Sequence, residues 1–330
     1  MSLADIVIVT PALRAANNGN WQTAQRWARF LVPDYRVRLT DAWTPGGASA
    51  HARLMIALHA RRSADSVDAW RAQQPGAPLL LVMTGTDLYR DLAVDARAQR
   101  SVALADRLLV LNDLGLTMLP AEARAKAAVC LQSAPTRQTR PKTRRHLRAL
   151  MVGHLREEKS PQTYFDAARR LAGRPDILLD HIGGALDPAL GAQAQALMAS
   201  HATYRWLGNL SHEATRRHIQ AAHVLVHASR MEGGAQVVIE AVASGTPVIA
   251  SRIDGNLGLL GAGYAGCFDW GDDAALAALL QRARDDPAML GGLQNQCAAR
   301  APLFSPAHER ATLLAQVQGL LAQAAVHPGA

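Results

Sequence analysis

Cysteine is scarce in this chain of 330 residues, and the few cysteines are scattered. Cys130, Cys267 and Cys297 match none of the short spacings of metal-binding motifs. Isolated thiols of this kind are typical of proteins from a reducing compartment. We therefore expect three structural thiols, a cytoplasmic location and no metal site.

Long apolar runs are missing as well. No stretch of eighteen apolar residues occurs, which predicts no membrane span. A strand-like run at 6–9 begins almost at once, without a basic segment or a small-residue cleavage site before it, so we expect no signal peptide. The composition, 49% hydrophobic and 19% charged, predicts a globular protein, and the length accommodates two domains.

Lysine is nearly absent, so arginine supplies almost all of the positive charge behind a net charge of +8. A basic protein suits nucleic acid, an acidic surface or anionic small molecules. The densest basic stretch, 137–148, contains no acid and no aromatic residue on which bases could stack. We interpret it as a solvated linker. The alternatives are a phosphate-facing hinge and, third, a nucleic-acid-binding segment, but we expect neither nucleic acid nor a membrane as a partner.

Apolar runs alternate with helical patterns along the whole chain. Continuous apolar strands separated by helices predict parallel sheets that are covered on both faces. The candidate strands are 6–10, 35–39, 54–59, 79–83, 107–111, 128–132, 149–153, 177–182, 204–207, 224–227 and 248–251, with 266–269 as a further candidate. The stretch 135–148 separates two such sets, so we predict an α/β protein of two doubly wound domains, 1–140 and 141–306.

Ligands of open α/β sheets bind beyond the carboxyl ends of the strands. Polar residues follow the predicted strands at 10–21, 59–63, 84–90, 153–159 and 229–234. If the two domains face each other with these ends inward, they enclose a cleft.

Arginines and hydroxyls gather at the strand ends of the first half. Arg26, Arg61, Arg62 and Arg90 suit a small, highly charged substrate, because guanidinium groups bind oxyanions with a fork geometry. Each of them alone is more often a surface or ion-pair residue. The loop 17–20 lacks the dinucleotide-binding G-x-G-x-x-G pattern, and it is either a tight backbone near a ligand or a plain turn.

The second half contains two carboxylates, Glu232 and Glu240, on either side of a glycine pair. A helix that opens at Gly233–Gly234 would present free N–H groups to a phosphate, with Glu240 about two turns further on. Ionised carboxylates can accept hydrogen bonds from sugar and ribose hydroxyls. The alternative is an ordinary helix with two solvent-facing acids.

Lys159 precedes a predicted helix that begins at Ser160–Pro161, and it is the expected anchor for a diphosphate. The alternative is a charged turn. No D-x-D string occurs, so we expect cationic side chains and helix termini, with no bound metal or other cofactor, to neutralise a leaving diphosphate. His223 and His227 are four apart on a strand, which is not a helix-type metal pair.

These motifs together resemble the family 4 glycosyltransferases of the GT-B fold, which have two Rossmann-like domains facing across a cleft. The resemblance rests on Gly153 to Lys159, Glu232 to Glu240 and the string 241–251. It implies a nucleotide-sugar donor on the C-terminal domain, an acceptor on the N-terminal domain and a tail helix, about 307–330, that packs back on the first domain. His154 stands where that family usually has arginine, and Arg156 is the candidate substitute.

A narrower resemblance covers both domains. The strings 58–65, 84–91, 132–135, 153–156, 204–208 and 229–234 look like those of the selenosugar synthases of selenoneine biosynthesis. That family implies transfer of a sugar from a UDP-sugar, with N-acetylglucosamine expected, to selenophosphate, and functional coupling to other selenoneine enzymes. An ionised selenium nucleophile needs no strong general base, so the site has to supply charge and orientation.

The resemblance assigns acceptor binding to Thr10, Gly19, Asn20, Thr23, Arg26, Arg61, Thr84, Thr86, Asp87 and Arg90. It assigns donor binding to Gly153, His154, Arg156, Lys159, Leu210, Met231, Glu232, Gly233, Gly234, Ala235 and Glu240. Among these, Arg61, Lys159 and Glu232 are expected to be catalytic. Two alternatives stay open: a glycosyltransferase with a hydroxyl acceptor and a base such as Asp87, and a non-catalytic nucleotide-sugar or nucleic-acid-binding module.

Overall fold

The structure, a computed structural model, describes residues 5–11 and 19–326. Its contacts divide the chain into two compact units, Met1–Gln132 with Pro306–Ala330, and Ser133–Ser305. The sequence placed the boundary at residue 140, whereas residues 133–140 pack with the second unit. Two backbone hydrogen bonds hold them there, from Ala134 N–H to Phe304 O at 3.2 Å and from Arg137 N–H to Ala243 O at 2.9 Å.

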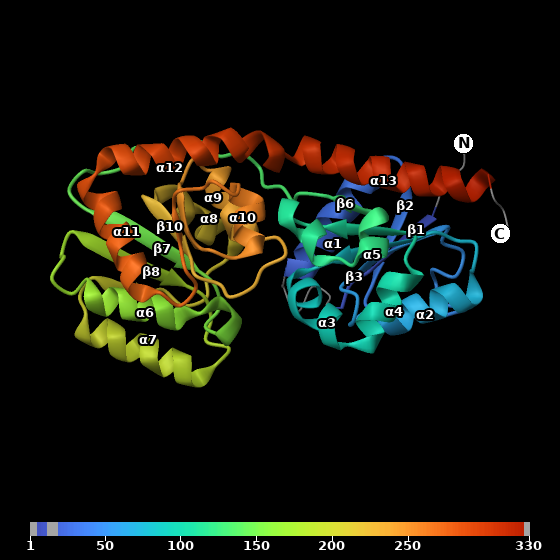
Figure 1. Ribbon diagram of the computed structural model, residues 1–330, viewed down its shortest axis with the longest axis horizontal. Coiled ribbons are helices and arrows are strands. Elements are labelled where there is room, and N and C mark those ends of the chain that lie inside the picture. Colours follow the sequence, from blue (N-terminus) through green and yellow to red (C-terminus); the bar gives the residue numbers. More distant parts are fainter. Residues whose placement is uncertain (1–4, 12–18, 327–330) are drawn as a thin grey trace. The chain divides into compact units, whose positions relative to one another are not determined.

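The first unit contains a parallel sheet of six strands in the order β2-β1-β3-β4-β5-β6 (Figure 1). The strands are β1 (Asp5–Val9), β2 (Arg36–Thr40), β3 (Leu54–Leu58), β4 (Leu79–Met83), β5 (Arg107–Val110) and β6 (Ala127–Val129). Its helices are α1 (Gly19–Leu31), α2 (Ala64–Gln73), the π-helical η2 (Asp87–Asp91), α3 (Leu92–Val94), α4 (Ala96–Leu104), η3 (Asp113–Met118), α5 (Ala121–Ala125) and α13 (Pro306–Val326). The strand order reverses between β1 and β3, where such sheets bind ligands.

Helices cover both faces of this sheet. Trp27 of α1 and Leu313 of α13 pack with one set of strand side chains, and Val67 and Trp70 of α2 pack with the other. Strands β3 and β4 are buried at every position. This is why they are continuously apolar in the sequence, since both faces lie against helices.

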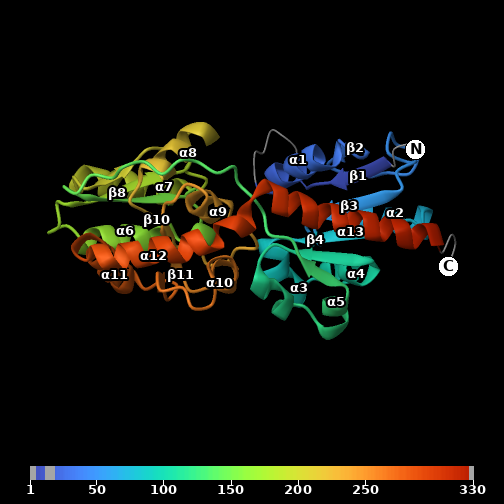
Figure 2. The same cartoon turned by 90° about the horizontal axis from the view of Figure 1, so that it is seen from above.

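Helix α13 is attached to α1 by a buried carboxylate. The Glu309 side chain is fully buried and accepts two hydrogen bonds from Arg26, at 2.8 and 3.0 Å. The indole N–H of Trp27 donates a third at 2.7 Å. Because a buried charge is stable only when it is paired and hydrogen-bonded, this cluster fixes the register of α13 on α1. Figure 2 shows α13 running along the sheet of the first unit.

The second unit contains another parallel sheet of six strands, in the order β12-β11-β10-β7-β8-β9. The strands are β7 (Leu147–Val152), β8 (Ile177–Ile182), β9 (Tyr204–Trp206), β10 (Val224–His227), β11 (Val248–Ser251) and β12 (Cys267–Phe268). Its helices are η4 (Glu157–Lys159), α6 (Pro161–Arg170), α7 (Pro188–Ser200), α8 (His212–Ala221), α9 (Gln236–Val242), α10 (Asp254–Leu260), α11 (Asp273–Asp285), α12 (Pro287–Arg300) and η5 (Ala301–Phe304). The order reverses between β7 and β10.

Both units are therefore doubly wound and Rossmann-like, and the predicted fold class is confirmed. The three cysteines are buried and free. Across residues 5–11 and 19–326, no helix is both long enough and apolar enough to cross a membrane.

Candidate functional site

The second unit brings Lys159 and Glu232 together at its topological switch point. Lys159 ends the short helix η4 beyond β7, and Glu232 lies beyond the end of the neighbouring strand β10. The Lys159 ammonium lies 2.5 Å from Glu232 Oε1. The Lys159 side chain passes close to Gly153, where a Cβ would be in ordinary contact with it at 3.4 Å. Two residues that are 73 apart along the sequence thus form one charged pair.

The Glu232 carboxyl is held in its ionised form. Burial opposes ionisation, but the Lys159 charge and the nearby His227 ring outweigh it and lower the pKa of Glu232 below its ordinary value. His227 Nε2 lies 3.5 Å from the same carboxylate oxygen and 3.3 Å from Ser229 Oγ. The site therefore contains a carboxylate and an ammonium that bind each other. In place of this contact, the carboxylate can bind ligand hydroxyls and the ammonium can bind phosphate oxygens.

The backbone of Glu232 depends on a glycine that sequence reasoning did not assign to the site. A Cβ at Gly255, in α10, would lie 1.9 Å from the Glu232 carbonyl oxygen. No side chain fits that distance, so only glycine lets α10 pack against this loop. The signal in the sequence is Gly255 itself, in the string 254–258.

Glu240 forms a second pair, with His212. Its carboxylate is 4% exposed, and Oε1 lies 2.6 Å from His212 Nε2. The hydrogen bond to Glu240 raises the pKa of His212, and burial of the ring opposes this. His212 opens α8 and is largely exposed, and nothing in the local sequence pointed to it. An incoming ribose could compete with this histidine for the carboxylate.

The predicted position of the helix around Glu240 was wrong. Helix α9 begins at Gln236 and has seven residues, so Gly233 and Gly234 lie in the loop before it. Ala235 has φ −74° and ψ 89°, which is outside the helical region. Glycine pays the largest entropy cost of helix formation, which explains why the helix starts after the glycine pair. Glu240 is consequently just over one turn into the helix instead of two.

The remaining predicted donor residues lie near Lys159 or near Glu232 in the sequence. His154 Nδ1 accepts a hydrogen bond from Gly184 N–H at 3.1 Å, so one ring nitrogen holds two loops together. Burial, Arg156 and Lys159 lower the pKa of His154, which favours the neutral ring. Arg156 is half-exposed and lies 3.9 Å from Glu158. Leu210 and Met231 are partly buried, and Ala235 is buried.

In the first unit, Asp87 is the centre of a buried polar cluster. Its Oδ2 accepts from Ala60 N–H at 2.8 Å, and its Oδ1 accepts from Thr84 Oγ1 at 2.7 Å. Burial raises the pKa of Asp87 to about 7. His59 Nε2 lies 3.0 Å from Thr86 Oγ1, and burial, with the Arg62 charge, lowers the pKa of His59 to about 4.

Three of the predicted acceptor residues, Thr84, Thr86 and Asp87, have partners within this cluster. Thr84 and Asp87 are 8% and 0% exposed. Asp87 binds the turn after β3 through Ala60 N–H, and Thr84 binds Asp87. Thr86 binds His59, whose φ of 73° lies in the left-handed region that residues other than glycine rarely adopt. The cluster therefore holds the loop 59–63 in place, and Asp87 is too buried to be a base for an acceptor.

Arg61 and Arg90 lie on either side of one carboxylate. Arg61 Nε lies 2.8 Å from Asp91 Oδ2, and Arg90 Nε lies 2.9 Å from Asp91 Oδ1. Burial opposes ionisation of Asp91, but the two guanidiniums outweigh it and lower its pKa. The sequence suggested neither this pairing nor the π-helical turn η2 that carries Asp91. Arg61 and Arg90 thus share an internal counter-ion.

The predicted acceptor residues of α1 serve the fold. Arg26 is paired with Glu309, as described above. Thr23 Oγ1 donates to Gly19 O at 2.9 Å and accepts from Gln132 Nε2 at 2.5 Å. Gly19 and Asn20 are the first residues of α1, while residues 17 and 18 of the predicted loop lie outside the described residues. Thr10 is fully buried beyond the end of β1.

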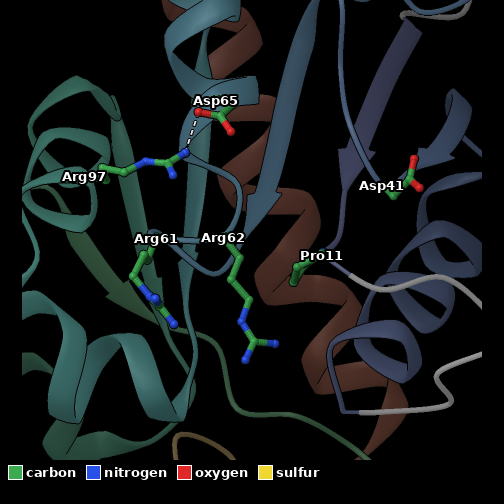
Figure 3. A pocket seen from close by; sticks show the side chains of 6 residues that line it. All are labelled: Pro11, Asp41, Arg61, Arg62, Asp65 and Arg97. Carbon is green, nitrogen blue, oxygen red and sulfur yellow. Dashed lines mark hydrogen bonds and ion pairs between the residues drawn. The ribbon is translucent and has the colours of Figure 1, made fainter.

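A pocket of about 420 Å³ opens beyond the ends of β1, β2 and β3 in the first unit. It is lined by Pro11, Asp41, Arg61, Arg62, Asp65 and Arg97 (Figure 3). Of these only Arg61 had been assigned to the site. The pocket lies beside the reversal of strand order between β1 and β3, where a doubly wound sheet binds its ligand.

Comparison with known proteins identifies a family that matches the second unit. Residues 135–303 match the family described as "Glycosyl transferases group 1". The D-inositol 3-phosphate glycosyltransferase of Arthrobacter sp. (strain FB24) is 32% identical over an alignment of 170 positions, and the match covers 47% of this chain. The match spans only 38% of that relative's length.

Two solved structures are similar over almost the whole chain. Sucrose-phosphate synthase from Thermosynechococcus elongatus has a TM-score of 0.79 at 18% identity, covering 97% of this chain and 100% of that one. HepE from Anabaena, solved in complex with UDP, has a TM-score of 0.76 at 15% identity, again covering 97% and 100%. At these identities the likeness concerns the fold.

Proposed function

Because the chain belongs to the group 1 glycosyl transferases and has the GT-B fold, we propose that it transfers the sugar of a UDP-sugar to selenophosphate. The displacement gives a sugar with a carbon–selenium bond whose selenium still carries the phosphoryl group, and UDP is released. Hydrolysis of the P–Se bond then gives phosphate and the free selenosugar. We assign the donor to the second unit and the acceptor to the first. N-acetylglucosamine is the sugar that we would test first.

The observation that carries the donor assignment is the Lys159–Glu232 pair at the switch point of the second sheet. The ammonium and the carboxylate are 2.5 Å apart at the carboxyl ends of β7 and β10. A diphosphate arriving there can take over the ammonium, and the released Glu232 can then accept from sugar hydroxyls. Glu240 offers a second carboxylate for ribose hydroxyls, and HepE, which has the same fold, was solved with UDP.

The reaction is a displacement at the anomeric carbon. A selenium lone pair forms the new bond to C1, while the C1–O bond to the diphosphate breaks and UDP leaves with the bonding electrons. Negative charge grows on the diphosphate, and the Lys159 cation stabilises it. No proton has to leave the nucleophile, because selenophosphate is already ionised near neutral pH.

The first unit supports an acceptor that needs no base. Asp87, the one carboxylate among the predicted acceptor residues, is fully buried, and both of its oxygens are engaged. The pocket beyond β1 and β3 instead offers guanidinium groups, which suit an oxyanion. Charge and orientation, and not proton transfer, are what these residues can supply.

A hydroxyl acceptor is the second candidate, and the match to D-inositol 3-phosphate glycosyltransferase favours it. A phosphorylated alcohol would also use guanidiniums for its phosphate. It would, in addition, require a general base for its hydroxyl.

A turnover experiment separates these candidates. The purified protein is incubated with UDP-N-acetylglucosamine and either selenophosphate, inositol 3-phosphate or no acceptor, under anaerobic conditions. UDP release is measured enzymatically, and the sugar product is identified by its mass and selenium isotope pattern. We expect UDP release that depends on selenophosphate and a selenium-containing sugar.

Two results would count against the proposal. Turnover with inositol 3-phosphate alone would favour the hydroxyl acceptor. UDP-sugar binding without UDP release, whatever the acceptor, would favour a non-catalytic nucleotide-sugar-binding protein. UDP-glucose in a parallel series tests the choice of sugar.

A further inference from the structure

Three arginines line the pocket of the first unit, and two of them are already paired. Arg61 Nε lies 2.8 Å from Asp91, and Arg97 is ion-paired with Asp65 (Figure 3). The Arg62 guanidinium has no ion pair or hydrogen bond among the described residues of this unit. The pocket therefore contains one uncompensated guanidinium, and it belongs to one of the four arginines that the sequence placed at the strand ends of the first half.

The side chains of the two neighbouring arginines lie differently. Figure 3 shows the Arg62 side chain between Arg61 and Pro11, with its guanidinium directed away from the Asp65–Arg97 pair. The other lining carboxylate, Asp41, is drawn beyond Pro11. An anion in the pocket can thus reach the Arg62 fork without breaking an existing ion pair. To use the Nε of Arg61, it would have to displace Asp91.

The backbone that carries Arg62 is fixed by buried groups. His59 N–H donates to Val82 O at 3.0 Å, and Ser63 Oγ donates to Leu58 O at 2.7 Å. Ala60 N–H donates to the Asp87 carboxylate at 2.8 Å. The turn 59–63 is therefore tied to the ends of both β3 and β4, so the Arg62 Cα position is set before any ligand arrives. Preorganisation of this kind lowers the entropy cost of binding.

We propose that Arg62 is the residue that binds the tetrahedral oxyanion of the acceptor, and that Arg61 belongs to the scaffold through Asp91. This inference rests on the proposed function in that it places the acceptor in the first unit. The ligand class is a small phosphate-like dianion. The guanidinium fork matches two oxygens of such an anion, which a lysine ammonium cannot do.

Anion binding can be measured without donor and without turnover. The probe is inorganic thiophosphate, a stable tetrahedral anion with a soft donor atom, titrated into the full-length protein by calorimetry. The variants are Arg62→Gln, Arg62→Lys and Arg61→Gln. Arg100→Gln is the matched control, because it removes the same charge from the same unit at an exposed residue paired with Asp68 outside the pocket.

We expect Arg62→Gln to weaken thiophosphate binding at least tenfold with an unchanged melting temperature, and Arg62→Lys to restore only part of the affinity. Arg61→Gln should lower the melting temperature, because it leaves Asp91 with one cation fewer, and should weaken binding less than Arg62→Gln does. Arg100→Gln should bind like the wild type. Wild-type binding should weaken as the salt concentration rises.

Three outcomes would overturn the inference: no thiophosphate binding by the wild type at millimolar concentration, an Arg62→Gln variant that binds like Arg100→Gln, or a larger affinity loss in Arg61→Gln than in Arg62→Gln. The proposed function fails separately. If thiophosphate binds through Arg62 but no acceptor releases UDP, the site stands and the transferase proposal falls. If Arg62→Gln turns over selenophosphate with an unchanged KM, only the inference about Arg62 falls.

Discussion

The two units use buried and partly buried carboxylates in different ways. In the first unit, Glu309 and Asp87 are fully buried, and their partners are groups that hold helices and loops together. In the second unit, Glu232 lies beyond the end of β10 beside Lys159 and His227, and Glu240 lies in α9 beside His212; Lys159 and His212 both remain accessible at least in part. Carboxylates of the first kind define the scaffold, and those of the second kind can exchange partners with a ligand.

The difference teaches that a charged motif cannot be assigned from its sequence alone. Arg26 and Lys159 are both cations that the sequence assigned to ligand binding, yet Arg26 binds a buried glutamate with two nitrogens and Lys159 binds one that is 14% exposed. The following predictions test this contrast, from the largest effect to the smallest.

Glu309→Ala should have the largest effect on stability. It leaves the partly buried Arg26 without its counter-ion and removes three hydrogen bonds. Breaking a buried ion pair by removing one partner costs about 3–5 kcal/mol. Urea denaturation followed by circular dichroism measures the loss. Asp34→Asn is the matched control, because it breaks an exposed pair between the same helix and the same unit, Arg310–Asp34, and should cost under about 1 kcal/mol. Equal losses in the two variants would contradict the contrast.

Asp87→Asn should change how stability depends on pH. Burial raises the pKa of Asp87 to about 7, so the folded protein holds a proton there that the unfolded chain releases near pH 4. This contribution to stability is present below pH 4 and is lost as the pH rises through 7. Asn does not titrate, so the variant does not lose stability in this way as the pH rises. The unfolding free energy of the variant minus that of the wild type should therefore increase between pH 4 and 8, by up to about 4 kcal/mol.

His59→Gln should change the pH dependence in the opposite direction. The pKa of His59 is lowered to about 4, so its contribution is present above about pH 6.5 and is lost as the pH falls through 4. Relative to the wild type, the variant should gain stability as the pH falls. Unfolding free energies from urea melts at several pH values measure both effects. If the difference in unfolding free energy between variant and wild type does not change with pH, the prediction that Asp87 and His59 have shifted pKa values in the folded protein is wrong.

Lys159→Met tests the second unit. Without its ammonium, the leaving diphosphate loses charge stabilisation, and kcat/KM for UDP release should fall about 100-fold, which corresponds to about 2.7 kcal/mol. Arg169→Gln, at an exposed residue of the following helix α6, serves as control and should stay within about twofold of the wild type. A Lys159→Met enzyme with normal kcat/KM would show that the Lys159–Glu232 pair is structural after all.

Glu240→Gln should have the smallest effect. An amide still accepts a hydrogen bond from a ribose hydroxyl but no longer as an anion, so we expect KM for the UDP-sugar to rise about tenfold with little change in kcat. His212→Gln removes only the partner of Glu240, and its KM should change less. A kcat that falls as much as kcat/KM would place Glu240 in transition-state stabilisation instead.

The fold could be read from the sequence to a large extent. Each predicted strand occurs because continuous apolar runs are the direct signature of a parallel sheet that is covered on both faces. The strand boundaries were predicted less well: β6 ends at Val129 and not at 132, and β7 starts at Leu147 and not at 149. Local propensity is weak at such ends, and tertiary contacts such as the Gln132–Thr23 hydrogen bond set them.

Only part of the candidate site could be predicted from the sequence. Lys159, Glu232 and Glu240 are found within short motifs, so sequence alone pointed to them. The pairings Arg26–Glu309 and Arg61–Asp91 join residues 283 and 30 apart, and no spacing rule predicts which arginine finds a carboxylate. For that reason the arginines of the first unit, chosen by position, proved to differ in what they bind.

The anchoring of α13 has a consequence for how the protein is made. Trp27 and Leu31 of α1 belong to the core cluster that α13 covers, and α13 follows the whole second unit along the chain. During synthesis, the ribosome must complete the second unit before the helix that seals the first one emerges. Until then, the nascent first unit exposes an apolar face that chaperones can bind. A chain truncated before residue 306 would keep that face exposed.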